Sequence, residues 1–267
     1  LSPYTTLFRS ASIPTLLMSM IHMSGDTSLL DGPLRPAGVY INEYQGYMSE
    51  EDKAQVRAQA LEVIKAFRDG GCKLPPPPSA ETIHRMMNFY VAQEVPEDYV
   101  PMMLEEMELD GQDQRSDAWG EEVPGASRQE HKVLVIGGGM SGVLAAYRLR
   151  EAGIPFVVIE KNADVGGTWF ENRYPGVRVD VGNHLYSYSF EPAHHWTQFF
   201  SQQQELQRYF ADVVQHHDLG DSFRFNTEVI SSVYDDSTKL WTVTTTGTGG
   251  KVEEHVVNTV ISAVVPL

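Results

Sequence analysis

The 267-residue sequence is poor in cysteine and in long apolar runs. Its one cysteine, Cys72, can form no disulfide within the chain, which is typical of a reducing compartment, so we expect a cytoplasmic protein. No stretch approaches the roughly 18 apolar residues that a membrane-spanning helix needs. Residues 13–23 are apolar but few, and no small-residue cleavage site follows them, which disfavours a signal peptide.

Basic residues are also scarce. Lys and Arg number 20 against 36 Asp and Glu, which gives a formal net charge of −16. Residues 1–130 carry −11 of this charge and residues 131–267 carry −5. Binding to nucleic-acid phosphates or to an anionic membrane surface needs clustered cations, so we expect neither partner. A hydrophobic content of 42% is nevertheless enough for a buried core.

The first half of the sequence predicts helices. Residues 13–23 form a short apolar segment typical of a buried helix. Ser49 is placed to cap a helix that Gly70-Gly71 ends, and Ser79 is placed to cap the next one. A short acidic helix is expected over 99–109. We predict that the methionines of these helices pack between helices, although a Met-rich binding surface is the alternative.

The chain divides by composition into four parts. Residues 1–10 resemble the translation of a sequencing-adapter oligonucleotide, so we expect them to be non-native. Residues 11–109 are predicted to form an all-α extension. Residues 110–130 are rich in Gly, Asp, Gln, Ser and Pro and predict a linker. Residues 131–267 form the last part.

This last part alternates between strand and helix patterns. Apolar strands are predicted over 131–136 and 155–160, with a helix over 141–152 between them. A long irregular segment covers 161–192. An amphipathic helix and short strands follow it, over 202–217, 223–226, 228–234, 241–246, 251–255 and 259–264. We therefore predict an α/β fold: a Rossmann-like domain whose parallel sheet carries a β-meander insertion, preceded by the helical extension.

The first strand and helix are joined by Gly137-Gly138-Gly139-Met140-Ser141-Gly142, a G-x-G-x-x-G pattern. Gly137 permits the tight turn, Gly139 leaves room for a pyrophosphate, and Gly142 lets the helix lie close to the sheet. Free amide groups at the helix start would then face the phosphates. A strand–helix turn without a ligand is the alternative interpretation.

Glu160 ends the second strand, 23 residues after Gly137. Its carboxylate can accept both ribose hydroxyls of an adenosine and would repel a 2′-phosphate, which argues against NADP in this cradle. FAD and NAD share this cradle. A second glycine pair, Gly166-Gly167, is similar to the one that flavoproteins with two dinucleotide domains carry, so the unit resembles an FAD site.

The run from Gly166 to Asp180 resembles the amino-terminal fingerprint of type I Baeyer–Villiger monooxygenases. The matching positions are Gly166, Gly167, Trp169, Tyr174, Pro175, Gly176 and Asp180. Downstream, the aromatic segment 186–190, Trp196, the helix over 202–217 and Val229 also resemble the family. The acidic helical extension is similar to that of the 4-hydroxyacetophenone monooxygenase subgroup.

The resemblance implies an enzyme that binds FAD, is reduced by NADPH and oxygenates a small ketone with O₂, through a peroxyflavin, to an ester. It implies one catalytic residue, Asp180, beside the flavin and the nicotinamide, with an ordinary solvated loop aspartate as the alternative. The implied cofactor-binding residues are Gly137, Gly139, Met140, Ser141, Gly142, Glu160, Lys161, Gly167, Thr168, Trp169, Arg178, Asp180, Tyr186 and Val229. The helical extension is a candidate homodimer contact.

Other features of the family are missing from the sequence. It has no second glycine-rich unit for NADPH and no Phe-x-Gly-x-x-x-His-x-x-x-Trp motif, so we expect a truncated chain that does not turn over alone. Two other functions stay open: a flavin monooxygenase that oxidises N or S centres, and a non-catalytic module for FAD binding or oligomerisation.

The pairs His194-His195 and His216-His217 lack ligand spacing, so no metal site is expected.

Overall fold

The computed structural model describes residues 11–39, 43–109, 123–183 and 185–264. The predicted non-native segment 1–10 and most of the predicted linker, residues 110–122, lie outside these ranges. The chain consists of two compact units, Leu1–Gln114 and Arg115–Leu267, and each is described by itself. Within the described part of the chain, every helix is too short or too polar to traverse a lipid bilayer.

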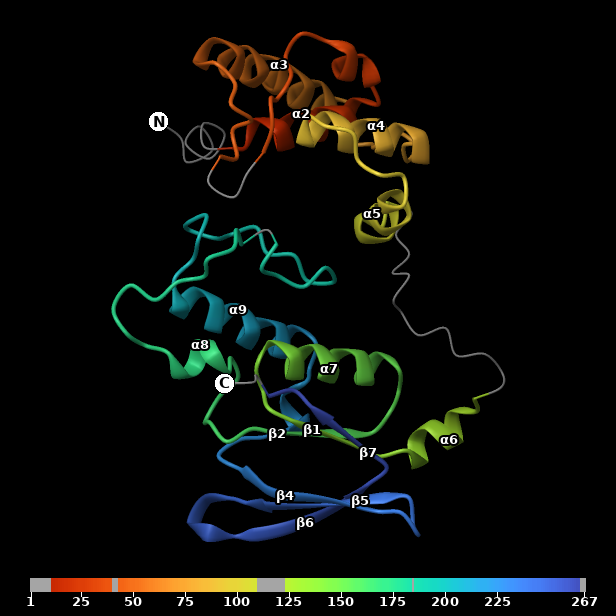
Figure 1. Cartoon of the computed structure of the whole chain (residues 1–267), viewed down its shortest axis with the longest axis vertical. Helices are drawn as coiled ribbons and strands as arrows, with labels where there is room; N and C mark the ends of the chain where they lie inside the picture. The colour runs from red at the N-terminus through yellow and green to blue at the C-terminus, as the bar shows by residue number, and fades with distance from the viewer. Residues whose placement is uncertain (1–10, 40–42, 110–122, 184, 265–267) are drawn as a thin grey trace. The chain divides into compact units, whose positions relative to one another are not determined.

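The first unit is helical, as predicted. Its elements are α2 (Ile13–Ser24), a 3₁₀ turn η1 (Thr27–Asp31), α3 (Glu50–Asp69), α4 (Ala80–Val91) and α5 (Tyr99–Met107) (Figure 1). Helix α2 supplies more buried residues to the core than any other helix of this unit, and α3 and α4 pack on it. The fully or nearly buried side chains include Ile13, Leu17, Met20, Ile21, Val56, Ala60, Ile83, Met86 and Phe89. Met86 is therefore part of the core and not of an exposed stripe.

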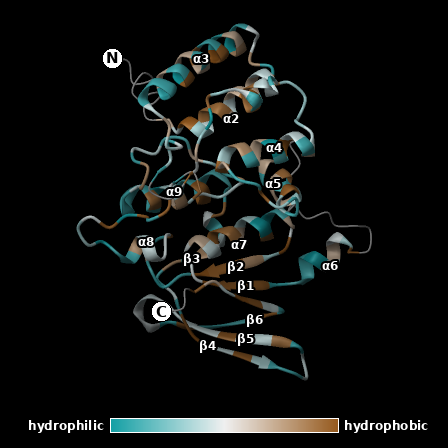
Figure 2. Ribbon diagram, turned by 45° about the horizontal axis from the view of Figure 1, so that its top comes forward, coloured by the Kyte–Doolittle hydropathy of each residue, from teal (hydrophilic) through white to brown (hydrophobic). Residues whose placement is uncertain are grey.

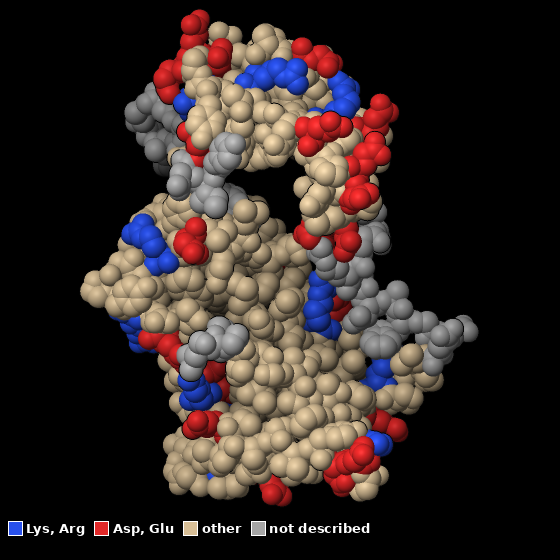
Figure 3. All heavy atoms as spheres, viewed as in Figure 1, with Lys and Arg blue, Asp and Glu red and all other residues tan. Residues whose placement is uncertain are grey.

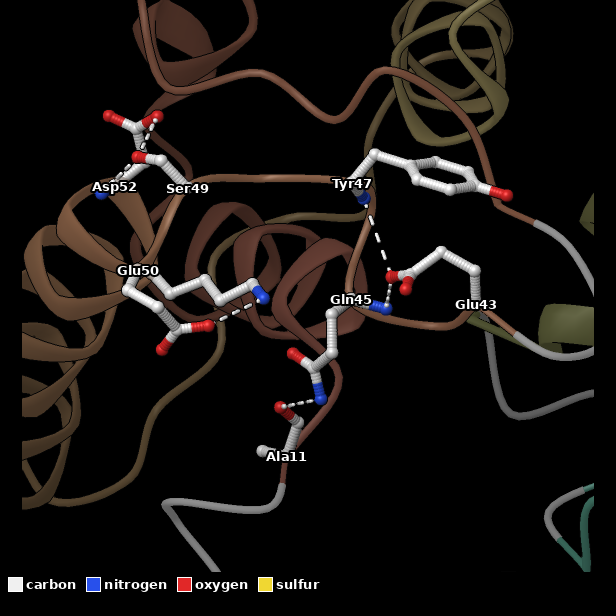
Figure 4. Close-up of polar contacts among 8 residues, drawn as sticks. Ala11, Glu43, Gln45, Tyr47, Ser49, Glu50 and Asp52 are labelled. Atoms are coloured by element: carbon white, nitrogen blue, oxygen red, sulfur yellow. Dashed lines mark hydrogen bonds and ion pairs between the residues drawn. The ribbon is translucent and has the colours of Figure 1, made fainter.

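Local hydrogen bonds explain where α3 begins. The Ser49 hydroxyl accepts the Asp52 amide at 3.1 Å and donates to the Asp52 carboxylate at 2.8 Å. Just before the helix, the Glu43 carboxylate accepts the Gln45 amide at 2.7 Å, which holds the turn that leads into it (Figure 4). Ser79 caps α4 in the same way by accepting the Thr82 amide. Both serine caps were predicted, because a cap needs only neighbours in sequence.

The second unit has the predicted α/β fold. Its main elements are α6 (Gly125–Glu130), β1 (Val133–Ile136), α7 (Met140–Glu151), β2 (Phe156–Ile159), α8 (Thr168–Glu171), α9 (Gln203–His216), β3 (Phe223–Arg224), β4 (Glu228–Asp235), β5 (Leu240–Thr246), β6 (Val252–Val257) and β7 (Thr259–Ser262). Two 3₁₀ turns complete the unit: η2 (Gly220–Ser222) lies between α9 and β3, and η3 (Thr248–Gly250) lies between β5 and β6. Helices α6 and α8 were not predicted. The first buries no residue and the second is four residues long, so neither produces an apolar period.

The four-stranded sheet has the order β3-β2-β1-β7, and its described pairings are all parallel. Strands β4, β5 and β6 form a separate antiparallel meander. Figure 1 shows α7 and α9 on one face of the parallel sheet and the meander on the other. Successive residues of β1 alternate between these two layers: Val133 and Val135 pack against the helices, and Leu134 packs against Val243 of β5. This double burial is why β1 and β2 are apolar along their length (Figure 2).

Charge is distributed as the composition indicated. On the face shown in Figure 3, the charged side chains of the helical unit are mostly acidic. The same view shows the second unit covered largely by uncharged residues. An anion that binds this face of the second unit must therefore rely on local donors rather than on a broad basic surface.

Candidate functional site

The glycine-rich turn joins β1 to α7 with no room for side chains at two positions. Gly137 has a φ of +104°, and a Cβ atom there would lie 3.0 Å from the Ala263 carbonyl oxygen after β7. A Cβ atom on Gly142 would lie 1.9 Å from the Gly137 carbonyl oxygen, inside any allowed contact. The first turn of α7 is therefore pressed directly onto the end of β1. This geometry agrees with the roles that the sequence assigned to both glycines.

The start of α7 presents free amide groups. The first helical hydrogen bond is donated by Val143 to the Gly139 carbonyl at 3.0 Å. The N–H groups of Met140, Ser141 and Gly142 precede it and have no acceptor within the helix. Together with the helix dipole they form a local environment that favours a negative group. Three of the predicted pyrophosphate contacts are thus adjacent donors.

A second glycine pair crosses this turn. The Gly166 amide donates to the Gly138 carbonyl at 3.0 Å. A Cβ atom on Gly167 would lie 3.0 Å from the Gly139 Cα atom, so the two backbones are in contact. Gly167 has a φ of +52°, which side chains other than glycine rarely adopt. The segment after β2 therefore returns to the start of α7 and borders the same donors.

Glu160 lies immediately after β2 and is 3% exposed. One carboxylate oxygen accepts the Gly138 amide at 2.5 Å, and the other accepts the Asn162 amide at 2.7 Å. Each carboxylate oxygen has a second lone pair, so both can still accept a hydroxyl. The carboxylate thus lies against the glycine turn, next to the predicted pyrophosphate donors.

Lys161, the next residue, forms an ion pair with Glu171 of α8 at 2.9 Å. Hydrogen bonds donated by the Asn162 side chain and by Lys161 hold the pKa of Glu171 below its usual value, against the opposing effect of burial. The bond to Glu171 in turn raises the pKa of Lys161. The observed role of Lys161 is to tie α8 to the end of β2.

Helix α8 carries two further predicted residues. Trp169 is buried, and its indole N–H donates to the Tyr186 hydroxyl at 3.0 Å, with the two rings at 86°. Thr168, the first residue of α8, is exposed. The buried side-chain amide of Gln203 on α9 donates to the Trp169 carbonyl, and this bond connects α8 to α9. Trp169 and Tyr186, 17 residues apart, are thus one packed pair.

Arg178 and Asp180 lie on an extended segment beside the residues that precede α9. Arg178 pairs in antiparallel fashion with Gln202 and donates to the Gln198 side chain at 3.2 Å. The Val179 amide between them donates to the Ser201 carbonyl at 3.1 Å. Asp180 is exposed, and its side chain makes no hydrogen bond or ion pair with the described residues. It is therefore open to an incoming group.

Val229 lies apart from this cluster, on β4. It is half-buried, pairs with Thr245 and packs in the layer between the parallel sheet and the meander. The β4–β5 register shifts between Val229 and Ser231. Its side chain therefore packs in the core, so the contact predicted at this position would have to be made by the backbone.

Two buried tyrosines were missed as site residues. Tyr188 donates to the Met140 carbonyl at 2.6 Å, and Tyr209 of α9 accepts the Tyr188 amide at 2.8 Å. Tyr209 falls on the buried face of α9 with Leu206 and Val213, which are spaced at helical intervals. That spacing was visible in the sequence, and a buried phenol hydroxyl requires a partner.

The histidine pairs show no metal geometry. Among the described residues, no three His, Cys, Asp or Glu side chains gather where they could bind a metal ion. His216 and His217 both contact the Glu191 carboxylate, at 3.2 and 3.0 Å. These two histidines join the end of α9 to Glu191, which immediately follows the aromatic segment 186–190.

Comparison with known proteins adds the following similarities. Residues 135–203 match the family model of the NAD(P)-binding Rossmann-like domain. An uncharacterized monooxygenase of Sinorhizobium fredii is 34% identical over 256 residues, which are 96% of this chain and 38% of that protein. A Baeyer–Villiger monooxygenase of Streptomyces coelicolor is 43% identical over 118 residues, or 43% of this chain and 23% of that protein. This chain thus spans less than two fifths of the length of either relative.

Among solved structures, a steroid monooxygenase bound to NADP is 35% identical with a TM-score of 0.44. The match covers 49% of this chain and 25% of that one.

Proposed function

We propose that this chain, a homologue of Baeyer–Villiger and other FAD-binding monooxygenases, is the FAD-binding portion of such an enzyme. Residues 131–267 would form the FAD domain and residues 11–109 a helical extension. The observation that carries the proposal is the crossing of Gly138-Gly139 with Gly166-Gly167 at the free amides of α7, beside the Glu160 carboxylate. Both crossing segments consist of glycines, so no side chain stands between their backbones and the free amides of α7.

These residues fit a dinucleotide. The amides of Met140, Ser141 and Gly142 would donate to the pyrophosphate, and the absence of side chains at Gly139 and Gly167 would allow close approach. Glu160 has the lone pairs to accept the ribose hydroxyls. Thr168, Trp169 and Tyr186 would border the flavin. The remaining predicted contacts are Lys161 and the backbone of Val229.

Bound FAD would supply the redox and oxygen chemistry, while the protein binds and orients it and excludes water. Asp180 would hold a negative charge beside the reactive ring, and Arg178 would lie close to NADPH. The exposure of Asp180 supports this role, because an exposed carboxylate can still pair with a cationic group from another part of the full protein. Two relatives are named Baeyer–Villiger monooxygenases, and the reaction proposed for the full protein is of that type: oxygenation of a small ketone with O₂ and NADPH.

The helical unit belongs to the same proposal. The Sinorhizobium relative aligns over 256 residues, which requires most of this unit to be included, whereas several other relatives align over 114 to 134 residues. The extension would therefore be specific to a subgroup of these enzymes. We propose a homodimer contact through it and a cytoplasmic location. Oxidation of N or S centres is the second candidate activity, because such enzymes would share this FAD unit.

The test is to purify the whole chain, add FAD, remove free flavin by gel filtration and record the absorption of the retained flavin. Retained flavin is expected at about one equivalent per chain. Gly139→Ala should lower the retained amount, because its methyl group would stand where two backbones meet. Gly220→Ala is the matched control, since a Cβ atom there meets nothing within 4 Å. A wild-type chain that retains no FAD would overturn the proposal.

A further inference from the structure

The Tyr188 hydroxyl contacts the start of α7 directly. It donates to the Met140 carbonyl oxygen at 2.6 Å, across 48 residues of sequence. Tyr188 is 8% exposed, and its ring centroid lies 4.8 Å from that of Phe190 and 5.8 Å from that of Phe210. The buried Tyr188 hydroxyl therefore holds one particular peptide group of the glycine-rich turn, the one that joins Met140 to Ser141.

Tyr188 is itself held from behind. Its amide donates to the Tyr209 hydroxyl at 2.8 Å, and that hydroxyl donates to the Glu191 carbonyl at 2.8 Å. Burial raises the pKa of Tyr188, and the neighbouring Tyr209 and Tyr186 add to this effect. Burial likewise raises the pKa of Tyr209 to about 12. Both phenols therefore stay protonated and act as donors at any physiological pH.

The carbonyl that receives this bond belongs to the same planar peptide group as the Ser141 amide. In a trans peptide the C=O and N–H bonds point in opposite directions, so fixing one fixes the other. A hydrogen bond accepted by the carbonyl also polarises the peptide and strengthens the N–H as a donor. Ser141 is one of the α7 amides that have no acceptor in the helix.

We propose that Tyr188 is a positioning residue for the cofactor pyrophosphate: it orients and polarises the 140–141 peptide so that the Ser141 amide binds the phosphate. This inference rests on the proposed function, since it presumes a dinucleotide at α7. Tyr188 does not touch the phosphate and acts only through the peptide. The hydroxyl, and not the ring, is the part that matters.

The test compares Tyr188→Phe with Tyr209→Phe in the whole chain. Both variants lose one buried phenol hydroxyl and keep the ring, but only the first loses a bond to α7. Three ligands are titrated, namely FAD, ADP and adenosine, because only the first two contain a pyrophosphate. Thermal unfolding without ligand measures the purely structural cost. Selective ¹⁵N-serine labelling reports the Ser141 amide in each protein.

Tyr188→Phe is expected to weaken FAD and ADP binding roughly threefold to tenfold, as for one lost hydrogen bond, and to leave adenosine binding unchanged. The Ser141 amide proton should move upfield. Tyr209→Phe keeps the hydroxyl that bonds to Met140, so it should weaken ADP binding less than Tyr188→Phe does. The inference is overturned if Tyr188→Phe binds ADP as tightly as wild type, or weakens adenosine equally. If wild type binds neither FAD nor ADP, the proposed function itself fails.

Discussion

A Cβ atom on Gly167 would lie 3.0 Å from the Cα atom of Gly139, so two backbone turns 28 residues apart touch without an intervening side chain. One turn follows β1 and the other follows β2. Because parallel neighbours end at the same edge of a sheet, the two turns necessarily meet there. The glycine-rich turn after β1 and the glycine pair after β2 therefore form one continuous backbone surface.

Gly167→Ala should destabilise the protein by about 1–3 kcal/mol, because alanine is strained at a φ of +52° and its methyl group meets backbone. Chemical denaturation measures the loss. Gly176→Ala is the control, since Gly176 also has a positive φ, of +83°, but nothing within 4 Å. An equal loss in the two variants would show that the contact with Gly139 has no energetic weight.

Gly142→Ala should be more damaging than Gly139→Ala. The Gly142 methyl group would stand 1.9 Å from the Gly137 carbonyl oxygen, which forces α7 away from β1, at a cost of about 3 kcal/mol or more. The Gly139 methyl group would meet Gly167 at 3.5 Å, an ordinary contact, so that variant should fold. Thermal unfolding of both proteins separates the structural glycine from the one that borders the ligand. A stable Gly142→Ala protein would contradict this account.

Glu160→Gln should lower both stability and FAD binding. Each carboxylate oxygen now accepts one backbone amide, from Gly138 and from Asn162. A glutamine has one acceptor oxygen, so its NH₂ group would face the other amide, donor against donor, at a cost of about 1–3 kcal/mol. Denaturation and FAD titration check the two effects. Glu254→Gln, at an exposed position, should change neither.

Glu171→Gln should reduce stability near neutral pH and have no effect in acid. The pKa of Glu171 is lowered by hydrogen bonds from Asn162 and Lys161. Its stabilisation is therefore present above the unfolded-state pKa of about 4.3 and is lost as the pH falls through the lowered value. The side chain is 44% exposed, so solvent screening limits the effect to less than about 1 kcal/mol. Unfolding free energies at pH 7 and in acid measure it; a difference that persists in acid would reject the assignment.

The parts of the structure predicted from the sequence depend on near neighbours. The serine caps at Ser49 and Ser79 need three residues, and the β1–turn–α7 motif needs about ten. The apolar runs over 131–136 and 155–160 predicted two parallel strands, and β1 and β2 are confirmed there as parallel neighbours. Helix α6 escaped prediction because it buries nothing, and α8 because one turn is too short to show a period.

The parts that were not predicted depend on distant partners. Nothing near Lys161 in the sequence indicates that its partner is Glu171 rather than a phosphate. The bond from the Gly138 amide to Glu160 arises only when β2 lies beside β1. Tyr188 stood within a recognised aromatic segment, but its acceptor, the Met140 carbonyl, is a backbone atom that no residue pattern marks. The sequence therefore indicated the donor, the Tyr188 side chain, but not its acceptor, the Met140 carbonyl.

The position of β1 between β2 and β7 has a consequence for synthesis of the chain. One neighbour of β1 follows it closely, whereas the other is the last strand, and the Lys132 amide bonds to the Asn258 side chain across 126 residues. Non-local parallel pairing of this kind slows folding. During translation, one edge of β1 therefore stays unpaired until the region around residue 262 has left the ribosome. The glycine turn at its end, which touches Ala263, would be completed only then.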